Sequence, residues 1–387
     1  MNQAPACDVV LLGGGHSHVG VLRRLGLAPM PGARLTLVSR DRFTPYSGML
    51  PGYVAGHYSF DDVHIDLSRL AAFAGARFIQ DEAVALDRSR QRVMTQRSGS
   101  EHYDWLSINT GATPGMRDVS GADAHGVPVK PIHRFNERWL QLLQRVRDGR
   151  GPVRIVVVGA GAGGVELVLA MHYRLRGERK ALGENPDDLQ FHLVSGTATI
   201  LPTHNRRVRR WFEAVLADRG VTVHRGARVA HAGPEGLTTV DGMIIGADEV
   251  VWTTSAAGAA WLGSTGLALD NDGFIRVRQT LQAVTDPRIF AAGDTATMDG
   301  FGREKAGVFA VRQGRPLAAN LRRVVAGDAP TRYRPQSRWL ALISTGDRHA
   351  VASRGAVSLR GRWVWRWKDW IDRRFMEQFA RLPVIGR

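Results

Sequence analysis

Two glycine-rich turns carry the clearest chemical signal in this 387-residue sequence. One follows the apolar run Asp8–Leu12, the other follows Val153–Val158, and residues with helical spacing come after each. Such a turn lets backbone N–H groups at a helix start bind a pyrophosphate, whose charge the helix dipole favours. Two of them predict two dinucleotide sites. The expected contact residues are Gly13, Gly15 and His18 in the first turn and Gly159, Gly161 and Gly164 in the second.

The two turns differ at the third position of the motif. The second turn reads G-x-G-x-x-G in full, whereas the first has His18 where the last glycine is expected. Because that glycine normally lets helix and strand pack closely, we predict that the first copy is imperfect. His16 and His18 are interpreted first as packing or turn residues, with contact to a phosphate as the alternative.

A second strand is predicted after each turn, over Arg34–Ser39 and Gln190–Ser195. In dinucleotide sites an acidic residue at the end of this strand binds a ribose hydroxyl. Here Ser39, followed by Arg40, and Ser195 stand in its place. We expect Ser39, Arg40 and Ser195 to contact the nucleotides, and the choice between NADH and NADPH stays open.

The sequence contains a single cysteine, Cys7, ahead of the first strand. An intramolecular disulfide relay and a cysteine-based metal site are therefore excluded. We predict no metal site and no protein nucleophile. The chemistry of the two sites would then fall to bound cofactors, for which the protein supplies orientation and electrostatics.

These sites require strands and helices in a fixed order. Each half shows strand, glycine turn, helix and strand, which is a βαβ unit. The predicted fold class is α/β, with two Rossmann-like domains, the second inserted into the first, and a small C-terminal strand-and-helix unit. The predicted boundaries are residues 1–116 and 259–335 for the first domain, 117–258 for the second and 336–387 for the C-terminal unit.

Three further motifs carry a resemblance to a known family. They are Tyr103–Pro114, Asp248–Thr254 and, most specifically, Thr285–Asp294, a strand that ends in Gly-Asp. Together with the glycine turns they resemble the FAD-dependent pyridine nucleotide-disulfide oxidoreductases of the glutathione reductase type. More narrowly, the chain is similar to type II NADH dehydrogenases and to the flavoprotein domain fused to selenophosphate synthetase in some organisms. The resemblance covers roughly Asp8 to Leu382.

The resemblance assigns the first site to FAD and the second to NAD(P)H. It implies that Asp294, which follows Gly293, hydrogen-bonds the ribityl chain of the flavin. It also implies that Gly111 lets the backbone pass close to the flavin nucleotide, and that the loop containing Pro45 runs beneath the flavin ring. The predicted cofactor contacts therefore include Pro45, Gly111, Gly293 and Asp294.

Three polar residues are catalytic candidates by the same resemblance. Glu166 lies just after the second turn, where related dehydrogenases have a glutamate near the nicotinamide; a favourable charge at a helix start is the alternative. Lys305 and Gln313 belong to a segment that resembles the helix covering the flavin edge and bordering the quinone pocket. Simple surface roles are their alternative.

Charge and the C-terminal region predict the partners. The 52 Lys and Arg against 36 Asp and Glu give a net charge of +16, which favours anionic partners, but no nucleic-acid-binding pattern accompanies it. Within Arg362–Phe379, tryptophans recur at helical spacing among arginines, as in helices at a membrane interface. The alternatives are packing on its own domain or on a partner, such as a second copy in a homodimer. Since no signal peptide is visible, we expect a cytoplasmic protein, peripheral on the inner face of the cell membrane.

The predicted function is that of an FAD-dependent NAD(P)H:quinone oxidoreductase. A hydride would pass from NAD(P)H to FAD, and electrons would then pass to a quinone-like acceptor without a protein disulfide. One alternative is a flavin reductase that supports selenium metabolism. Another is a non-catalytic flavin scaffold whose second nucleotide site has decayed, suggested by Ser195, Gly196 and Ser255.

Overall fold

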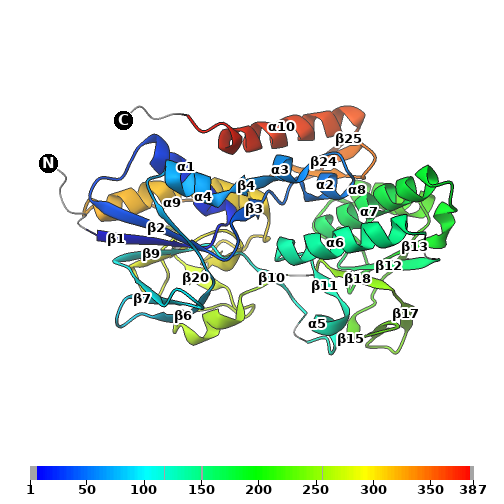
Figure 1. Ribbon diagram of the computed structural model, residues 1–387, viewed down its shortest axis with the longest axis horizontal. Helices are drawn as coiled ribbons and strands as arrows, with labels where there is room; N and C mark the ends of the chain where they lie inside the picture. Colours follow the sequence, from blue (N-terminus) through cyan, green and yellow to red (C-terminus); the bar gives the residue numbers. More distant parts are fainter. Residues whose placement is uncertain (1–6, 117, 150, 255, 384–387) are drawn as a thin grey trace.

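The computed structural model describes residues 7–116, 118–149, 151–254 and 256–383. Two five-stranded sheets form its framework, and all their strand pairs are parallel. The two sheets lie side by side, and a long C-terminal helix lies along one side of the molecule across both (Figure 1).

The first sheet has the strand order β21-β9-β1-β2-β5. The strands are β1 (Cys7–Leu12), β2 (Ala33–Ser39), β5 (Arg77–Gln80), β9 (Trp105–Ile108) and β21 (Ile289–Ala291). The main helices beside it are α1 (His16–Leu27), α4 (Leu67–Phe73) and α9 (Gly307–Val325), and α1 packs against the other two. Val9 to Leu12 are all buried, because a central strand of a parallel sheet is covered on both faces.

The second sheet repeats this order as β11-β18-β12-β13-β14. The strands are β11 (Val127–Pro128), β12 (Val153–Val158), β13 (Leu189–Val194), β14 (Val221–His224) and β18 (Glu249–Trp252). Its helices are α6 (Ile132–Arg147), α7 (Ala162–Ala181) and α8 (Arg206–Asp218). A three-stranded antiparallel sheet precedes β9 in the first half and β18 in the second. In the first half it consists of β6 (Ala83–Asp87), β7 (Arg92–Thr95) and β8 (Ser100–His102). In the second it consists of β15 (Val229–Gly233), β16 (Gly236–Thr239) and β17 (Ile244–Gly246).

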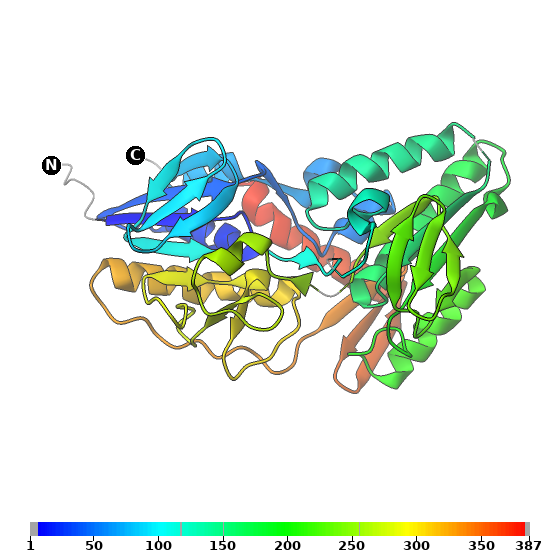
Figure 2. The same ribbon diagram turned by 90° about the horizontal axis from the view of Figure 1, so that it is seen from below.

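The chain passes between the halves through two neighbouring segments. β10 (Thr113–Pro114) leads out of the first half, β19 (Ala256–Ala257) leads back, and the two pair in antiparallel fashion. Figure 2 shows the two halves joined at this narrow crossing. The predicted fold class, a Rossmann-like unit inserted into another, is therefore confirmed. The residue boundaries of the domains stay a prediction.

Shorter elements complete the two halves. In the first they are β3 (Phe43–Pro45), α2 (Leu50–Val54), α3 (Phe60–Val63), β4 (His64–Asp66), β20 (Ile275–Val277) and β22 (Ala296–Met298), with 3-10 turns at Ala260–Ser264 and Gly293–Thr295. In the second they are α5 (Ala122–His125) and the 3-10 turn Pro186–Asp188.

The C-terminal unit is the antiparallel sheet β23 (Ala341–Ser344), β24 (Ala350–Arg354) and β25 (Val357–Gly361), followed by α10 (Arg362–Ala380). The tryptophans that recur at helical spacing on this helix lie on its outer face. Trp363, Trp367 and Trp370 are exposed, whereas the inner face buries Lys368 and Asp372. This charged pair tolerates burial because the two side chains form an i,i+4 ion pair of 2.6 Å. Among the described residues, no helix is both long and apolar enough to span a membrane.

Candidate cofactor and electron-transfer site

The first glycine turn joins the end of β1 to the start of α1 and lies against the residues that follow β9. Gly13 has a φ of +94°, and a Cβ there would lie 2.5 Å from the carbonyl oxygen of Asn109. A Cβ on Gly15 would lie 2.2 Å from Oδ1 of the same asparagine. Only glycine fits at these positions. The N-cap residue Gly15 offers no side-chain cap, and the N–H of His18 donates to Oδ1 of Asn109 at 3.3 Å. The first two N–H groups of α1 are thus the ones that suit an anion.

His18 does not face a ligand, which corrects its prediction as a cofactor contact. Its ring is fully buried, with Nδ1 2.7 Å from the carbonyl oxygen of Gly13 and Nε2 2.8 Å from Oγ of Ser107. Burial lowers the pKa of His18 to about 4, so the ring is neutral. Because the carbonyl can only accept, Nδ1 donates to Gly13 and Nε2 accepts from the Ser107 hydroxyl. His18 supports the turn from behind.

The second glycine turn joins β12 to α7 and has glycine at all three motif positions. A Cβ on Gly159, at φ +113°, would lie 2.7 Å from the backbone of Thr253, and one on Gly164 would lie 1.8 Å from the carbonyl oxygen of Gly159. A Cβ on Gly161 would meet no atom within 4 Å. α7 also begins without a side-chain cap. The turn combines the tight packing and the open helix start that a pyrophosphate site requires.

The residues predicted at the ribose positions close local turns in both halves. The hydroxyl of Ser39 donates to the carbonyl oxygen of Asp41 at 3.0 Å, and that of Ser195 donates to the carbonyl oxygen of Thr197 at 2.9 Å. Arg40 is exposed and pairs with Asp41 at 3.2 Å. Ser195 is thus neither an acid, which would repel a 2′-phosphate, nor an arginine, which would bind one. Ser255 lies outside the described residues.

The Gly-Asp motif after β21 meets the first turn. The N–H of Gly293, at φ +69°, donates to Oε1 of Gln313 at 2.6 Å, and the amide of Asn109 donates to the carbonyl just before Gly293 at 2.6 Å. Gln313, a catalytic candidate, therefore holds the motif in place. Gly111 has a φ of +78°, and a Cβ there would meet no atom within 4 Å, so this stretch of backbone is open to a ligand.

Asp294 forms a shielded ion pair beside the first turn. Its Oδ2 lies 2.8 Å from Nζ of Lys130, which follows β11 of the other half. Burial acts to raise the pKa of Asp294, but the Lys130 ammonium outweighs it and holds that pKa below its ordinary value. The neighbouring His16 has a buried Nε2 with no partner among the described residues, and burial lowers its pKa to about 4. An unpaired buried nitrogen of this kind is one that a bound polar ligand would satisfy.

Lys305 approaches this region from the other side. Its Nζ donates to a carbonyl of β22 at 2.6 Å and to the hydroxyl of Thr297 at 2.9 Å, and lies 3.7 Å above the Phe274 ring. Burial lowers the pKa of Lys305 to about 8. Lys305, Asp294 and Gln313 line one small cavity of about 40 Å³. The structure thus brings two catalytic candidates together beside the predicted flavin contact.

Glu166 lies where both halves meet the C-terminal unit. Its Oε1 accepts from the N–H of Ser344 at 2.7 Å. Among charged groups, Lys368 of α10 has the largest effect on the pKa of Glu166. Nζ of Lys368 donates to Oδ2 of Asp372 at 2.6 Å and to the carbonyl oxygen of Gly48 at 2.6 Å. Burial raises the pKa of Glu166, although Lys368 partly offsets it. The buried ammonium of Lys368 therefore pairs with Asp372 and also acts on Glu166 through its charge.

The loop after β3 connects this buried cluster to the first turn. Pro45 pairs with β4, and the next residue, Tyr46, hydrogen-bonds Asp372 through its hydroxyl. The Tyr46 ring lies 4.5 Å from that of Phe375 and 5.5 Å from that of His16, centre to centre. The predicted loop is thus clamped between α10 and the first glycine turn, so α10 has a structural link to the site.

Four residues of this region were not predicted as site residues. They are Asn109 at the first turn, Lys130, and the pair Lys368 and Asp372. Asn109 lies inside a motif that the sequence analysis used, and the i,i+4 spacing of Lys368 and Asp372 is a recognisable ion-pair pattern. Lys130 gives no local signal, because its partner is 164 positions away.

Comparison with known proteins decides the family. The model of the family described as pyridine nucleotide-disulphide oxidoreductase matches residues 7–316. The chain belongs to the pyridine nucleotide-disulphide oxidoreductase family. FAD and a pyridine nucleotide are the cofactors of this family, in agreement with the predicted FAD and NAD(P)H, and its members are oxidoreductases.

Relatives within the family are similar over most of their length. An NADH dehydrogenase-like protein of Mycobacterium tuberculosis is 26% identical over 320 residues, which cover 80% of this chain and 77% of that protein. A type II NADH:quinone oxidoreductase of Haemophilus influenzae is 26% identical over 330 residues, covering 75% and 74%. The predicted likeness to type II NADH dehydrogenases is therefore confirmed.

Solved structures extend the likeness of fold to nearly the whole chain. The sulfide:quinone oxidoreductase of Aquifex aeolicus superposes with a TM-score of 0.79 at 20% identity, covering 96% of this chain and 91% of that one. NDH2 of Plasmodium falciparum in complex with NADH gives a TM-score of 0.79 at 14% identity, covering 98% and 100%. The fold of the C-terminal unit is thus shared as well.

Proposed function

We propose that this family member oxidises NADH or NADPH and passes the electrons through bound FAD to a quinone at a membrane surface. The observation that carries the proposal is the pairing of two glycine turns, each at an uncapped helix start, with no thiol near either. The single cysteine, Cys7, lies at the opposite end of β1 from the first turn. Electron transfer through a protein disulfide is therefore not available, and the electrons pass directly to an acceptor.

The residues of the first half fit FAD. The uncapped start of α1 suits its pyrophosphate, and the unpaired Nε2 of His16 and the open backbone at Gly111 suit a polar ligand alongside. Asp294 would hold the ribityl chain, and Lys130 keeps it ionised as an acceptor. FAD, when bound, takes up a hydride from a nicotinamide and passes its electrons on to an acceptor.

The chain's own charged residues suit that task. The ammonium groups of Lys130 and Lys305 supply positive charge beside Asp294, and they would stabilise negative charge on a reduced flavin bound there. Glu166 Oε1, whose pKa is raised, can hold a proton at neutral pH more readily than an exposed glutamate, and Lys368 Nζ is an adjacent donor. Glu166 therefore remains our candidate for proton supply at the seam between the halves.

The outer face of α10 supports an acceptor taken from a membrane. Trp363 and Trp370 are 53% and 56% exposed, and four arginines, Arg362, Arg366, Arg373 and Arg374, are exposed on the same helix. Exposed indoles flanked by arginines suit the headgroup region of a bilayer. Quinones with long tails dissolve in the bilayer next to this region, and the name of the Haemophilus relative, an NADH:quinone oxidoreductase, agrees with this acceptor class.

The decisive experiment is an anaerobic titration of the purified yellow protein with NADH and then NADPH, followed by flavin absorbance. We expect rapid bleaching with at least one nucleotide and recovery of the colour when a soluble short-chain quinone is added. Bleaching that a quinone does not reverse would support oxidation of the nicotinamide nucleotide and reject a quinone as the electron acceptor. No bleaching by either nucleotide, while dithionite still reduces the flavin, would favour the flavin scaffold. The selenium-linked alternative stays a prediction.

A further inference from the structure

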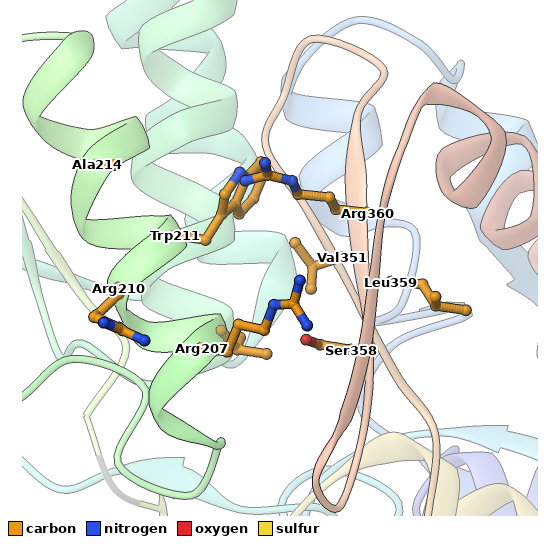
Figure 3. Close-up of a pocket in the computed structure, with 9 residues that line it drawn as sticks. Arg207, Arg210, Trp211, Ala214, Val351, Ser358, Leu359 and Arg360 are labelled. Carbon is orange, nitrogen blue, oxygen red and sulfur yellow. The ribbon is translucent and has the colours of Figure 1, made fainter.

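A cavity of about 420 Å³ opens between α8 and the hairpin β24–β25 (Figure 3). Its apolar lining includes Trp211, Ala214 and Val351. Arg207 extends from α8 toward Ser358, and Arg360 extends from β25 over the Trp211 ring, 5.6 Å from its centre.

The arginines of this cavity have no acidic partner among the residues that the structure describes. Arg207, Arg210 and Arg360 form none of the described ion pairs, whereas Arg219 and Arg225, at and beyond the end of α8, pair with Asp347 and Glu213. Arg207 and Arg360 therefore present guanidinium groups without acidic partners at an apolar cavity. A bound anion would pair with them, and a guanidinium can bind a phosphate through two parallel hydrogen bonds.

The walls of the cavity are held in place by hydrogen bonds. Nδ2 of Asn205, the N-cap residue of α8, donates to the carbonyl oxygen of Gly355 at 2.9 Å, and Nδ1 of His204 lies 3.0 Å from Oγ of Ser353. Helix and hairpin are therefore fixed to each other at the hairpin turn. A site that exists before its ligand arrives pays little ordering cost on binding.

The hairpin also connects the cavity with the exposed tryptophans. β25 ends at Gly361 and α10 begins at Arg362, and Val357 and Leu359 on β25 are 64% and 48% exposed. Figure 3 shows the Leu359 side chain on the side of β25 opposite Arg207, so these exposed apolar residues form a rim on the outer side of β25, next to the cavity and on the strand that leads into α10. A ligand with a phosphate and a hydrocarbon chain matches both the cationic mouth and this apolar rim.

We propose that the cavity binds the headgroup of an anionic phospholipid. Arg207 and Arg360 would pair with its phosphate, and the first carbons of its chains would lie against Trp211 and Val351. This inference rests on the membrane association proposed above and adds a defined lipid site to it. The continuity between cationic cavity and apolar rim favours a lipid over a free phosphate, which would use the arginines alone.

The test uses the FAD-containing protein and two kinds of vesicle, pure phosphatidylcholine and phosphatidylcholine with phosphatidylglycerol, in a flotation assay. We expect stronger binding to the anionic vesicles. In the double variant Arg207→Gln, Arg360→Gln that partition should fall roughly 30-fold. The control Arg134→Gln, Arg228→Gln removes the same charge from exposed positions outside the cavity and should lose much less. Equal losses in both variants would reduce the effect to net charge and overturn the site.

Two outcomes separate this inference from the proposed function. If the wild type binds both kinds of vesicle equally, membrane association stands and the lipid site is rejected. If it binds neither, membrane association is rejected, and the site is tested with water-soluble dihexanoyl phosphatidylglycerol by tryptophan fluorescence. Saturable quenching that Arg207→Gln, Arg360→Gln abolishes, and that dihexanoyl phosphatidylcholine or inorganic phosphate does not reproduce, supports the site; no quenching, or equal quenching by inorganic phosphate, rejects it.

Discussion

The two glycine turns solve one packing problem in opposite ways. In the second turn the helix comes so close that a Cβ on Gly164 would lie 1.8 Å from the carbonyl oxygen of Gly159. In the first turn His18 occupies the equivalent position, and its ring fills the space and hydrogen-bonds the carbonyl oxygen of Gly13 at 2.7 Å. In the second turn that carbonyl is bonded instead by the Thr253 hydroxyl at 2.9 Å. In both turns a side chain hydrogen-bonds the carbonyl oxygen of the first glycine, and the helix that follows begins without a side-chain cap.

The comparison shows that a turn can meet the physical requirement of the motif without having glycine at every motif position. The requirement is that the turn carbonyl be paired and that the helix start remain uncapped. A glycine meets it by close approach, and a histidine meets it by spanning a wider gap to Ser107. A departure from G-x-G-x-x-G is therefore weak evidence of a lost site when a side chain takes over the same bonds.

The largest effect is expected from Gly164→Ala. A methyl group 1.8 Å from a backbone oxygen cannot be accommodated without moving α7 away from the turn. We expect the rate of flavin bleaching by NADH to fall at least about 100-fold, because a misplacement of about 1 Å can cost that much, while the FAD content stays unchanged. The control Gly177→Ala lies in the same helix with no neighbour within 4 Å, and should keep full activity. Normal bleaching in Gly164→Ala would remove the second turn from the mechanism.

The next effect tests the first turn with His18→Gly, which completes the glycine motif. The structure predicts that this apparent improvement is harmful, since it leaves the Gly13 carbonyl and the Ser107 hydroxyl unpaired and opens a cavity. We expect a loss of about 3 kcal/mol in the free energy of unfolding and release of FAD during gel filtration. Ser107→Ala, which removes one hydrogen bond only, should cost about 1 kcal/mol. A His18→Gly protein that retains FAD like the wild type would show that His18 merely tolerates its position.

Much of this framework could be predicted from sequence, and the limits have physical reasons. The first two strands of each βαβ unit were located to within one residue, because buried parallel strands are continuous apolar runs bounded by glycine turns. The support provided by His18 was not predicted as such, because it depends on Ser107, 89 positions away.

The inner face of α10 shows the same limit. The spacing of its tryptophans indicated the outer face but not that Lys368 and Asp372 turn inward. Their inward position depends on Gly48 and Tyr46 of a distant loop, which complete their hydrogen bonds. Sequence periodicity reports which residues share a face. It does not report which face finds partners elsewhere in the chain.

The first half buries Lys305 close to the predicted flavin contact, and the charge of this lysine predicts a pH dependence of activity. Burial lowers the pKa of Lys305 to about 8, so its ammonium is present below that pH and lost above it. We expect quinone reduction by the wild type to decline as pH rises through about 8, and Lys305→Met to be roughly tenfold slower without this decline. Lys180→Met, on the exposed side of α7, serves as control.

Stability provides an independent check of the same lysine. A folded-state pKa below the ordinary value means that the buried charge destabilises the fold at low pH, and that this cost fades as pH rises above 8. Lys305→Met should therefore unfold at a higher temperature than the wild type at pH 7, with the gain shrinking toward pH 10. An unchanged activity profile in Lys305→Met would assign the decline to another group.

The smallest effect concerns the ribose positions, where the two halves match. Ser39 ends β2 and Ser195 directly follows β13, and each closes the next turn through its hydroxyl. Ser195→Asp would place a carboxylate where a 2′-phosphate would bind, so we expect the ratio of NADPH to NADH efficiency to fall about tenfold while FAD content is unchanged. Ser39→Asp, the matched change in the other half, should leave that ratio unaltered. If the ratio followed Ser39 instead, the assignment of the halves to the two nucleotides would be reversed. If neither change altered it, Ser195 would lie outside the ribose contact, and selection between the nucleotides would have to come from other residues of the second half.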